Sequence, residues 1–138
     1  MNKVFFDLEW NTGFLNGNSF DEIIEIGAVK TDEEYRQIDG FRRLIRPVIY
    51  RKMNPYIQKI LAITMKDLQG EEPLASVAKA FFDWCGDCDT LIAWSGNDFG
   101  VLEKNLAHIG MKIPEQLGRY DVQMAYAYRT ENSIRNYA

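Results

Sequence analysis

The stretch Val4-Phe5-Phe6-Asp7-Leu8-Glu9 carries the strongest structural and chemical signal in the sequence. Its short apolar and aromatic pattern predicts a buried β-strand. Asp7 and Glu9 are two residues apart, so in a strand both side chains leave the same face, roughly 7 Å apart along the backbone. Paired carboxylates in a buried strand repel each other and lose hydration, which favours a bound cation. Hard divalent ions such as Mg²⁺ or Mn²⁺ prefer these oxygen ligands. The alternative is that both acids lie at the end of a strand and face water, which is the more common situation for an isolated Asp-x-Glu.

Asp98 adds a third acid to this pair. It ends the segment Trp94-Ser95-Gly96-Asn97-Asp98, which joins a predicted buried strand to a helix. Asp98 shares a helical face with Leu102 and other apolar residues, so it lies on the stripe that packs on the sheet. Most aspartates at helix starts only cap the helix or face solvent. One that follows a buried strand and aligns with the apolar stripe is better placed for a site, and it strengthens the case for a metal centre.

The rest of the pattern predicts an α/β fold, a mixed sheet with helices packed on it. Three strands come first and would form an antiparallel meander, and helices then alternate with shorter strands. The predicted strands are residues 4–9, 22–30, 35–45, 90–94 and 120–122. The predicted helices are residues 70–85, 97–108 and 124–129, and residues 56–63 also have helical spacing. Residues 11–13 and 16–18 predict loops, and residues 64–67 have the pattern of a capping box.

Length and composition bound the class of protein. The chain has 138 residues, which suits one domain over residues 1–138, and its hydrophobic share of 46% is enough for a real core. The net charge of −4 argues against a strongly basic protein that coats nucleic acid, although local charge can oppose the global sign. No apolar stretch approaches the roughly 18 residues of a membrane span, and no signal-peptide pattern opens the chain. We therefore expect a soluble cytoplasmic protein without a membrane partner.

Two motifs together resemble the DEDD (DnaQ-like) 3′–5′ exonucleases. Phe5-Phe6-Asp7-Leu8-Glu9, followed by Ile23-Ile24-Glu25-Ile26-Gly27-Ala28-Val29, resembles the first exonuclease motif. Leu91-Ile92-Ala93-Trp94-Ser95-Gly96-Asn97-Asp98 with Leu102 is similar to the second. The resemblance covers residues 4 to about 123. It implies a ribonuclease H-like fold and metal-dependent release of nucleoside monophosphates from the 3′ ends of single-stranded DNA or RNA.

Residue by residue, the resemblance implies a site for two Mg²⁺ or Mn²⁺ ions. Asp7 and Glu9 would hold the metals, and Asp98 would assist the second one directly or through water. Two cations roughly 4 Å apart would orient and activate a water and stabilise the leaving 3′ oxygen. These three acids are the predicted catalytic and metal-binding residues. The predicted substrate contacts are Leu8, Trp10, Asn11, Thr12 and Thr64.

Two short segments contain most of the predicted substrate contacts, and each is compared with the corresponding segment of the family. Trp10-Asn11-Thr12-Gly13 is one residue longer than the family's Thr-Thr-Gly, so Thr12 and the backbone would meet the terminal nucleotide while Trp10 stacks on a base. Ile63-Thr64 resembles the family's substrate-facing turn.

The sequence departs from the family at the fourth carboxylate. The family carries it on a C-terminal helix, in a His-x-x-x-x-Asp or Tyr-x-x-x-Asp pattern whose His or Tyr orients the attacking water. His108, the single histidine, is followed five residues later by Ile113, and the spacing match of Tyr35 and Asp39 precedes the second motif. We therefore expect a domain truncated at its C-terminus, with weak or absent catalysis by this chain.

Two alternatives to an active exonuclease stay open. The first is a catalytically inactive exonuclease-like module that binds nucleic acid or a protein partner. The second, weaker one is a metal-dependent phosphodiesterase for small nucleotides. A sheet without its covering helix would in either case expose apolar surface and favour self-association.

Four further features each have two interpretations. Residues 41–66 hold seven basic side chains and no acidic one, which fits either a phosphate-tracking rim or a solvated face. Cys85 and Cys88 form a CxxC without a second ligand pair for zinc, so we interpret them as ordinary thiols at a helix end. Glu25 is an acid close to the metals or an edge acid with a basic partner, and we favour the second. Asp121 caps the following helix or replaces the missing acid, and we favour the cap.

Overall fold

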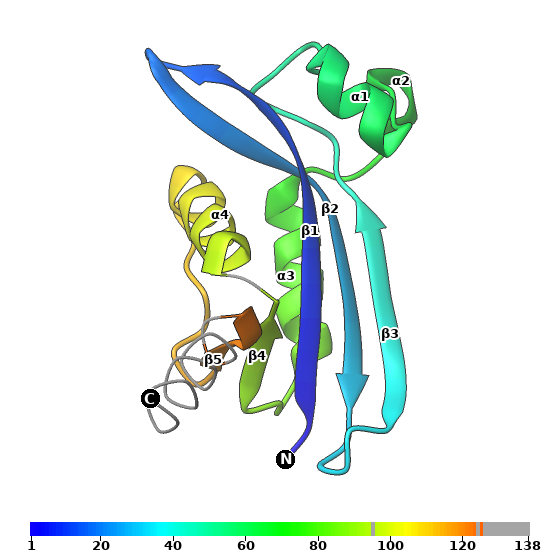
Figure 1. Cartoon of the computed structure of the whole chain (residues 1–138), viewed down its shortest axis with the longest axis vertical. Helices are drawn as coiled ribbons and strands as arrows, with labels where there is room; N and C mark the ends of the chain where they lie inside the picture. Colours follow the sequence, from blue (N-terminus) through cyan, green and yellow to red (C-terminus); the bar gives the residue numbers. More distant parts are fainter. Residues whose placement is uncertain (95, 124, 126–138) are drawn as a thin grey trace, which may run out of the picture.

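A five-stranded mixed sheet lies at the centre of the chain, in the order β3-β2-β1-β4-β5. The computed structural model describes residues 1–94, 96–123 and 125 (Figure 1). β1 (Lys3–Leu15), β2 (Asn18–Thr31) and β3 (Gln37–Leu44) form an antiparallel meander. β4 (Thr90–Ala93) pairs in parallel with β1, and β5 (Gly118–Asp121) pairs in parallel with β4. The predicted α/β class and mixed sheet are confirmed.

Four helices accompany the sheet in the described part of the chain. α3 (Leu74–Cys85) and α4 (Gly96–His108) pack on one face, whereas α1 (Pro55–Leu61) and α2 (Met65–Leu68) lie near the far half of the β1–β2 hairpin (Figure 1). The predicted capping box opens α2, because the Thr64 hydroxyl accepts from the Asp67 N–H and the Asp67 carboxylate accepts from the Thr64 N–H. None of the helices described is long and apolar enough to cross a membrane.

β1 and β2 are longer than the sequence pattern predicts. The loop predicted at residues 11–13 is wrong, because these residues continue β1 opposite residues 20–22 of β2. The hydrogen-bonded ladder between the two strands outweighs the weak strand propensity of asparagine and glycine. The chain reverses at Asn16 and Gly17, whose φ angles of 53° and 82° suit a two-residue hairpin turn. The helix predicted for residues 124–129 lies, apart from residue 125, outside the described residues.

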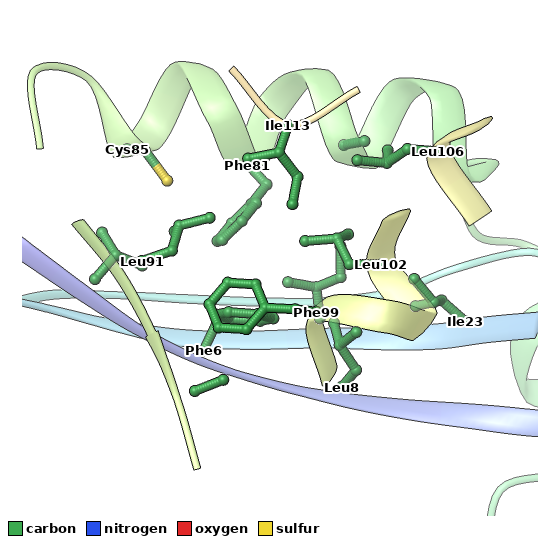
Figure 2. Packing of buried hydrophobic residues seen from close by; sticks show 14 of the residues in the cluster. Phe6, Leu8, Ile23, Phe81, Cys85, Leu91, Phe99, Leu102, Leu106 and Ile113 are labelled. Carbon is green, nitrogen blue, oxygen red and sulfur yellow. The ribbon is translucent and has the colours of Figure 1, made fainter. Parts of the chain in front are cut away.

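The main core fills the space between the sheet and the two longer helices. Alternation along β1 directs Val4, Phe6 and Leu8 into it, because successive residues of a strand point to opposite faces (Figure 2). Phe81 of α3 is fully buried, with its ring centroid 6.4 Å from that of Phe6. Phe99 of α4 packs edge-on against Phe6 from the other side, at 5.2 Å. These three rings join both helices to the strand that carries the two predicted acids.

A β-bulge in β2 divides this strand between two cores. The pairing of β2 with β1 skips Ile24. Ile23 and Ile26 both join the main core, although residues three apart in a regular strand point to opposite faces. Ile24 instead joins a second cluster with Met53 and Leu68, against which α1 and α2 pack. The bulge therefore lets one strand hold α3 and α4 on one face and α1 and α2 on the other.

We expect Phe81→Ala to lower the free energy of unfolding by about 3–5 kcal/mol, because it empties the centre of the main core. Urea denaturation followed by circular dichroism measures the change. Phe14→Ala is the matched control, since Phe14 is 78% exposed at the hairpin tip and its loss should cost less than about 0.5 kcal/mol. Equal losses in the two variants would contradict this description of the core.

Candidate active site

Asp7 and Glu9 lie on the face of β1 that looks away from the main core. Their neighbours Val4, Phe6 and Leu8 are buried, whereas Asp7 is exposed and Glu9 is half-buried. β4 pairs with β1 only along Lys3–Phe5, so both acids stand just beyond the end of β4. Because β4 ends here, the edge of β1 beyond Phe5 is free to contact α4, the helix that follows β4.

Asp98 reaches the two strand acids from the first turn of α4. α4 begins three residues after β4 ends, and Asp98 is only 7% exposed. Burial and then the charge of Asp7 raise the pKa of the Asp98 carboxyl to about 6, with a smaller contribution from Asp121. A backbone hydrogen bond from Leu8 acts in the opposite direction and ties the carboxyl to β1. The third predicted acid is therefore held against the strand that carries the first two.

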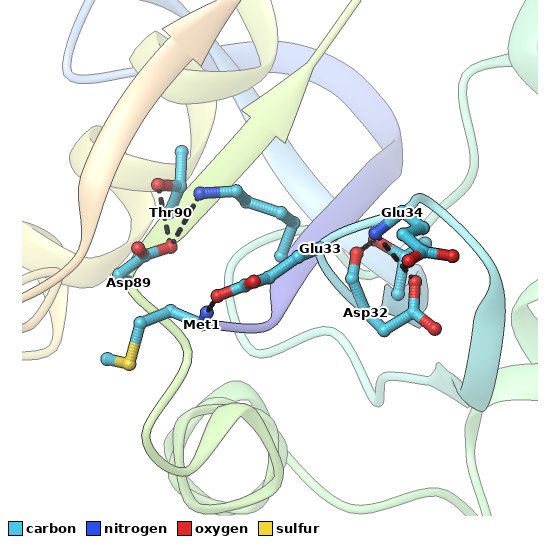
Figure 3. Close-up of polar contacts among 8 residues, drawn as sticks. Met1, Asp32, Glu33, Glu34, Asp89 and Thr90 are labelled. Atoms are coloured by element: carbon cyan, nitrogen blue, oxygen red, sulfur yellow. Dashed lines mark hydrogen bonds and ion pairs between the residues drawn. The ribbon is translucent and has the colours of Figure 1, made fainter.

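The same electrostatic coupling is visible at Glu9. Burial raises the pKa of this carboxyl, and Asp7, Glu25 and Asp98 raise it further in that order. Asp89 and Glu33, at the opposite end of the sheet, behave differently because each has a cationic partner (Figure 3). There, for example, a hydrogen bond from Lys3 lowers the pKa of Asp89, with Nζ and Oδ1 3.0 Å apart. The cluster of Asp7, Glu9 and Asp98 is thus a place of uncompensated negative charge.

The donor set of this cluster fits a hard divalent cation. It offers carboxylate oxygens, and a bound cation would relieve the burial and the neighbouring negative charge that raise the pKa values of Glu9 and Asp98. The side chains do not, however, form a closed coordination shell: within the described residues, no group of three or more His, Cys, Asp or Glu is arranged to hold a metal ion. The structure thus brings the three predicted acids within electrostatic reach of one another but not into a metal-holding arrangement, and their metal-binding role stays a prediction.

Two further acids lie near the cluster. Glu25 forms an ion pair with Arg42 of β3, with its Oε2 3.0 Å from the guanidinium nitrogen, so the predicted basic partner is present. Its strand β2 lies inside the sheet, however, and Glu25 also raises the pKa of Glu9. Asp121 ends β5 and lies against Gly96 at the start of α4, where a Cβ would stand 2.8 Å from its Oδ2. Asp121 also raises the pKa of Asp98. The sequence did not indicate this proximity, because only the parallel pairing of β4 and β5 places residues 96 and 121 side by side.

The side chains predicted to contact substrate are all engaged within the chain. Leu8 is buried in the main core, and Trp10 packs against it from a half-buried position. Asn11 is fully buried. The Thr12 hydroxyl donates to Asp21 at 2.9 Å, and Thr64 is the N-cap of α2. Their roles toward substrate stay predictions.

The two sequence features that partly matched the missing motif lie apart from the acids. His108 ends α4 and packs its ring 5.8 Å from that of Phe20. Asp39 accepts a hydrogen bond from the Trp84 indole at 3.0 Å, so its spacing from Tyr35 serves a structural contact with α3.

Beside the acids, the same face of the sheet is hollowed. The hollow has a volume of about 460 Å³ and is lined mainly by apolar and aromatic side chains of β1, β4 and β5, among them Phe5, Ile92 and Tyr120. Tyr120 is 44% exposed. This is the surface through which self-association was expected, and that expectation stays a prediction.

The sheet has the strand order β3-β2-β1-β4-β5, with an Asp-x-Glu on its central strand β1 and an aspartate at the start of α4, the helix that follows β4. These features define a ribonuclease H-like exonuclease domain. The sequence model of the exonuclease family RNase T matches residues 4–136. The chain belongs to this family, the DnaQ-like 3′–5′ exonucleases.

Individual relatives agree with this assignment. The DNA polymerase III PolC-type of Clostridium perfringens (strain 13 / Type A) is 34% identical over 112 residues, which are 80% of this chain and 7% of that protein. The nuclease domain of 3′hExo, a DEDDh family member bound to rAMP, superposes with a TM-score of 0.71 at 20% identity, covering 83% of this chain and 62% of that one. E. coli exonuclease I in complex with a 5cy-dA13 oligonucleotide gives 0.72 at 16% identity, covering 88% and 28%. The chain thus spans less than two thirds of each, and the structural likeness shows the fold.

Asp98→Asn should stabilise the protein at pH 8 in EDTA by up to about 3 kcal/mol, because it removes a charge that burial and Asp7 disfavour. The raised pKa also sets the sign of the pH dependence. As the pH falls from about 6 toward 4, the folded carboxyl takes up a proton before the unfolded one, so the wild-type protein gains stability that the variant does not. Urea unfolding at pH 8, 6 and 4.5 tests this, with exposed Asp87→Asn as the control. Parallel pH profiles for wild type and Asp98→Asn would contradict the buried charge.

Both thiols of the CxxC should be unreactive in the folded protein. Cys85 and Cys88 are free and buried, burial raises the pKa of Cys85 to about 12, and it also raises that of Cys88. Because the thiolate is the reactive form, a thiol reagent at pH 8 should label them at least about 100-fold more slowly in buffer than in urea. Rapid labelling of the native protein would refute the interpretation of ordinary buried thiols.

Proposed function

We propose that this chain is the core of a metal-dependent 3′–5′ exonuclease domain that trims single-stranded DNA or RNA ends. The observation that carries the proposal is the juxtaposition of Asp7, Glu9 and Asp98 at the end of β4, where the charge of Asp7 adds to burial in raising the pKa values of Glu9 and Asp98. Membership of the exonuclease family supports it. Two relatives of the same fold are described in complex with a nucleotide or an oligonucleotide, rAMP in 3′hExo and 5cy-dA13 in exonuclease I.

In the proposed mechanism, Asp7, Glu9 and Asp98 would hold Mg²⁺ or Mn²⁺. Bound divalent ions supply an activated water and neutralise the charge that develops on the leaving 3′ oxygen. The chain's own groups constrain the site: the Leu8 backbone donates a hydrogen bond to the Asp98 carboxyl, and Arg42 pairs with Glu25, which lies opposite Glu9 on β2. Because phosphoryl transfer depends mostly on positioning and charge neutralisation, a rigid carboxylate cluster is the main requirement.

The fourth carboxylate and the His or Tyr that orients water are not evident in the sequence after the second motif. We therefore propose a domain that is incomplete in this chain, with low turnover. Asp121 is the acid best placed to compensate, since it lies against the start of α4 and interacts with Asp98.

Asp7→Asn should reduce Mn²⁺-dependent trimming by at least about 100-fold, the scale seen when a preorganised electrostatic group is lost. The assay titrates Mn²⁺ against a single-stranded oligonucleotide labelled at its 3′ end and measures release of the labelled mononucleotide. Asp87→Asn removes an exposed acid away from the cluster and should leave the rate unchanged. A polypeptide extended beyond residue 138 and the Asp121→Asn variant, measured in parallel, show whether the missing group lies in a further segment or is replaced by Asp121.

Unchanged trimming by Asp7→Asn would reject the assignment of the site. Absence of trimming at every Mn²⁺ concentration in both the chain and its extended form, with retained binding of the oligonucleotide, would instead establish the inactive exonuclease-like module.

A further inference from the structure

We infer that a second surface, formed by Arg51, Lys52, Tyr56 and Lys59, binds the part of a single strand that lies upstream of its 3′ end. We call this surface the basic exosite. The inference rests on the proposed function, because it assumes that the 3′ end of the same strand reaches Asp7, Glu9 and Asp98. The exosite lies in residues 41–66, which contain none of the three catalytic acids.

Positive and negative charges are separated along the chain. Residues 41–66 carry a net charge of +7, whereas the rest of the chain carries −11. All seven basic side chains of this segment are exposed. Among the described residues, only Arg42 of these seven forms an ion pair, with Glu25. Exposed cations without acidic partners, in a protein that is acidic overall, form a local surface to which a polyanion can bind.

The fold attaches this basic segment to β1, the strand that carries Asp7 and Glu9. Asn11 lies two residues beyond Glu9 on the same strand, about 7 Å along it. Its buried amide donates to the Lys52 carbonyl at 3.1 Å, and its Oδ1 accepts from the Asn54 N–H at 2.8 Å. The loop that presents Arg51 and Lys52 therefore has a fixed position close to the acid cluster.

A buried carboxylate holds the other end of the same loop. Glu22 of β2 is 4% exposed and accepts three consecutive backbone N–H groups, those of Val48, Ile49 and Tyr50, at 2.8–3.0 Å. Because Glu22 bonds only to backbone in this network, it leaves the adjacent Arg51 and Lys52 side chains free of a neutralising partner. The loop backbone is thus rigid while its cations face solvent.

An exposed aromatic residue, Tyr56, accompanies these cations on α1. Tyr56 is 71% exposed on α1, and Lys59 lies three residues later, on the same side of the helix. Ile57 and Leu61 turn inward and pack against the second hydrophobic cluster, so α1 presents Tyr56 and Lys59 outward. An aromatic ring beside cations is the arrangement that binds single strands, because bases stack on the ring while the cations contact phosphates.

These features favour a single strand over other polyanions. A duplex hides the faces of its bases, so Tyr56 would have nothing to stack on. An acidic protein would meet the cations but would not use the ring in this way.

The test is equilibrium binding of a 5′-labelled 20-nucleotide single strand, followed by fluorescence anisotropy in EDTA at several salt concentrations. Arg51→Gln/Lys52→Gln/Lys59→Gln should weaken binding at low salt by at least about tenfold. It should also reduce the slope of log K against log salt by about 2, the value for three lost phosphate contacts on a single strand. Tyr56→Ala should weaken binding by about tenfold with little change in slope. The substituted side chains are all exposed, and circular dichroism confirms that the variants fold.

The matched control is Lys79→Gln/Lys104→Gln/Lys112→Gln, which removes the same charge from exposed positions outside residues 41–66. The inference is overturned if this control and the exosite variant lose affinity and slope equally, or if Tyr56→Ala binds like wild type. It is also overturned if a duplex or polyglutamate binds as tightly as the single strand and loses affinity equally in the exosite variant.

The binding assay contains no metal and involves no hydrolysis, so it is separate from the test of the proposed function. Asp7→Asn should retain binding in EDTA. Failure of the exosite would appear as normal trimming with no effect of the exosite variant on binding. Failure of the proposed function would appear as specific single-strand binding without trimming.

Discussion

The mutual repulsion of three carboxylates at the end of a short parallel strand is the constraint on which the site depends. β4 pairs with β1 only as far as Phe5, and the chain then turns into α4. This early end lets Asp98 enter beside β1 and take a backbone hydrogen bond from Leu8. The main core makes the arrangement rigid, because Phe6 packs on both α3 and α4. Because Glu9 and Asp98 are held close to Asp7, a proton or a bound cation would relieve the burial and repulsion that raise their pKa values.

The bulge at Ile24 connects this cluster to the rest of the molecule. By skipping one residue in its pairing with β1, β2 keeps Ile23 and Ile26 in the main core and still presents Ile24 to the opposite face. The small second core that forms there supports α1 and α2. Without the bulge, all residues of β2 on one side of Ile24 would point to the opposite face of the sheet. Either Glu25 would then leave the face that carries Glu9, or the second cluster that supports α1 would be lost.

Opposite charges are arranged along one face of the hairpin. The acids occupy the middle of β1, and the loop that carries Arg51 and Lys52 is attached two residues further on, through Asn11. The buried Asn11 amide and the Glu22 carboxylate together fix this loop relative to the acid cluster. In the proposed function, this separation of charge would orient a strand, with its phosphates held at the loop and its end directed to the acids.

The sequence by itself determined the identity and spacing of the three acids, the alternation that directs Phe6 inward and Asp7 outward, and the capping box at Thr64. These features follow from local periods and neighbouring residues, which the chain carries wherever it folds. Only the tertiary structure decided that residues 11–13 extend β1, that Asn11 holds the loop before α1, and that Asp121 lies against Gly96. Each of these depends on contacts between residues distant in sequence, where the ladder of a partner strand or the packing of a loop overrides local propensity. For the same reason, the pattern Asn11-Thr12-Gly13 predicts a loop in isolation and forms a strand opposite β2.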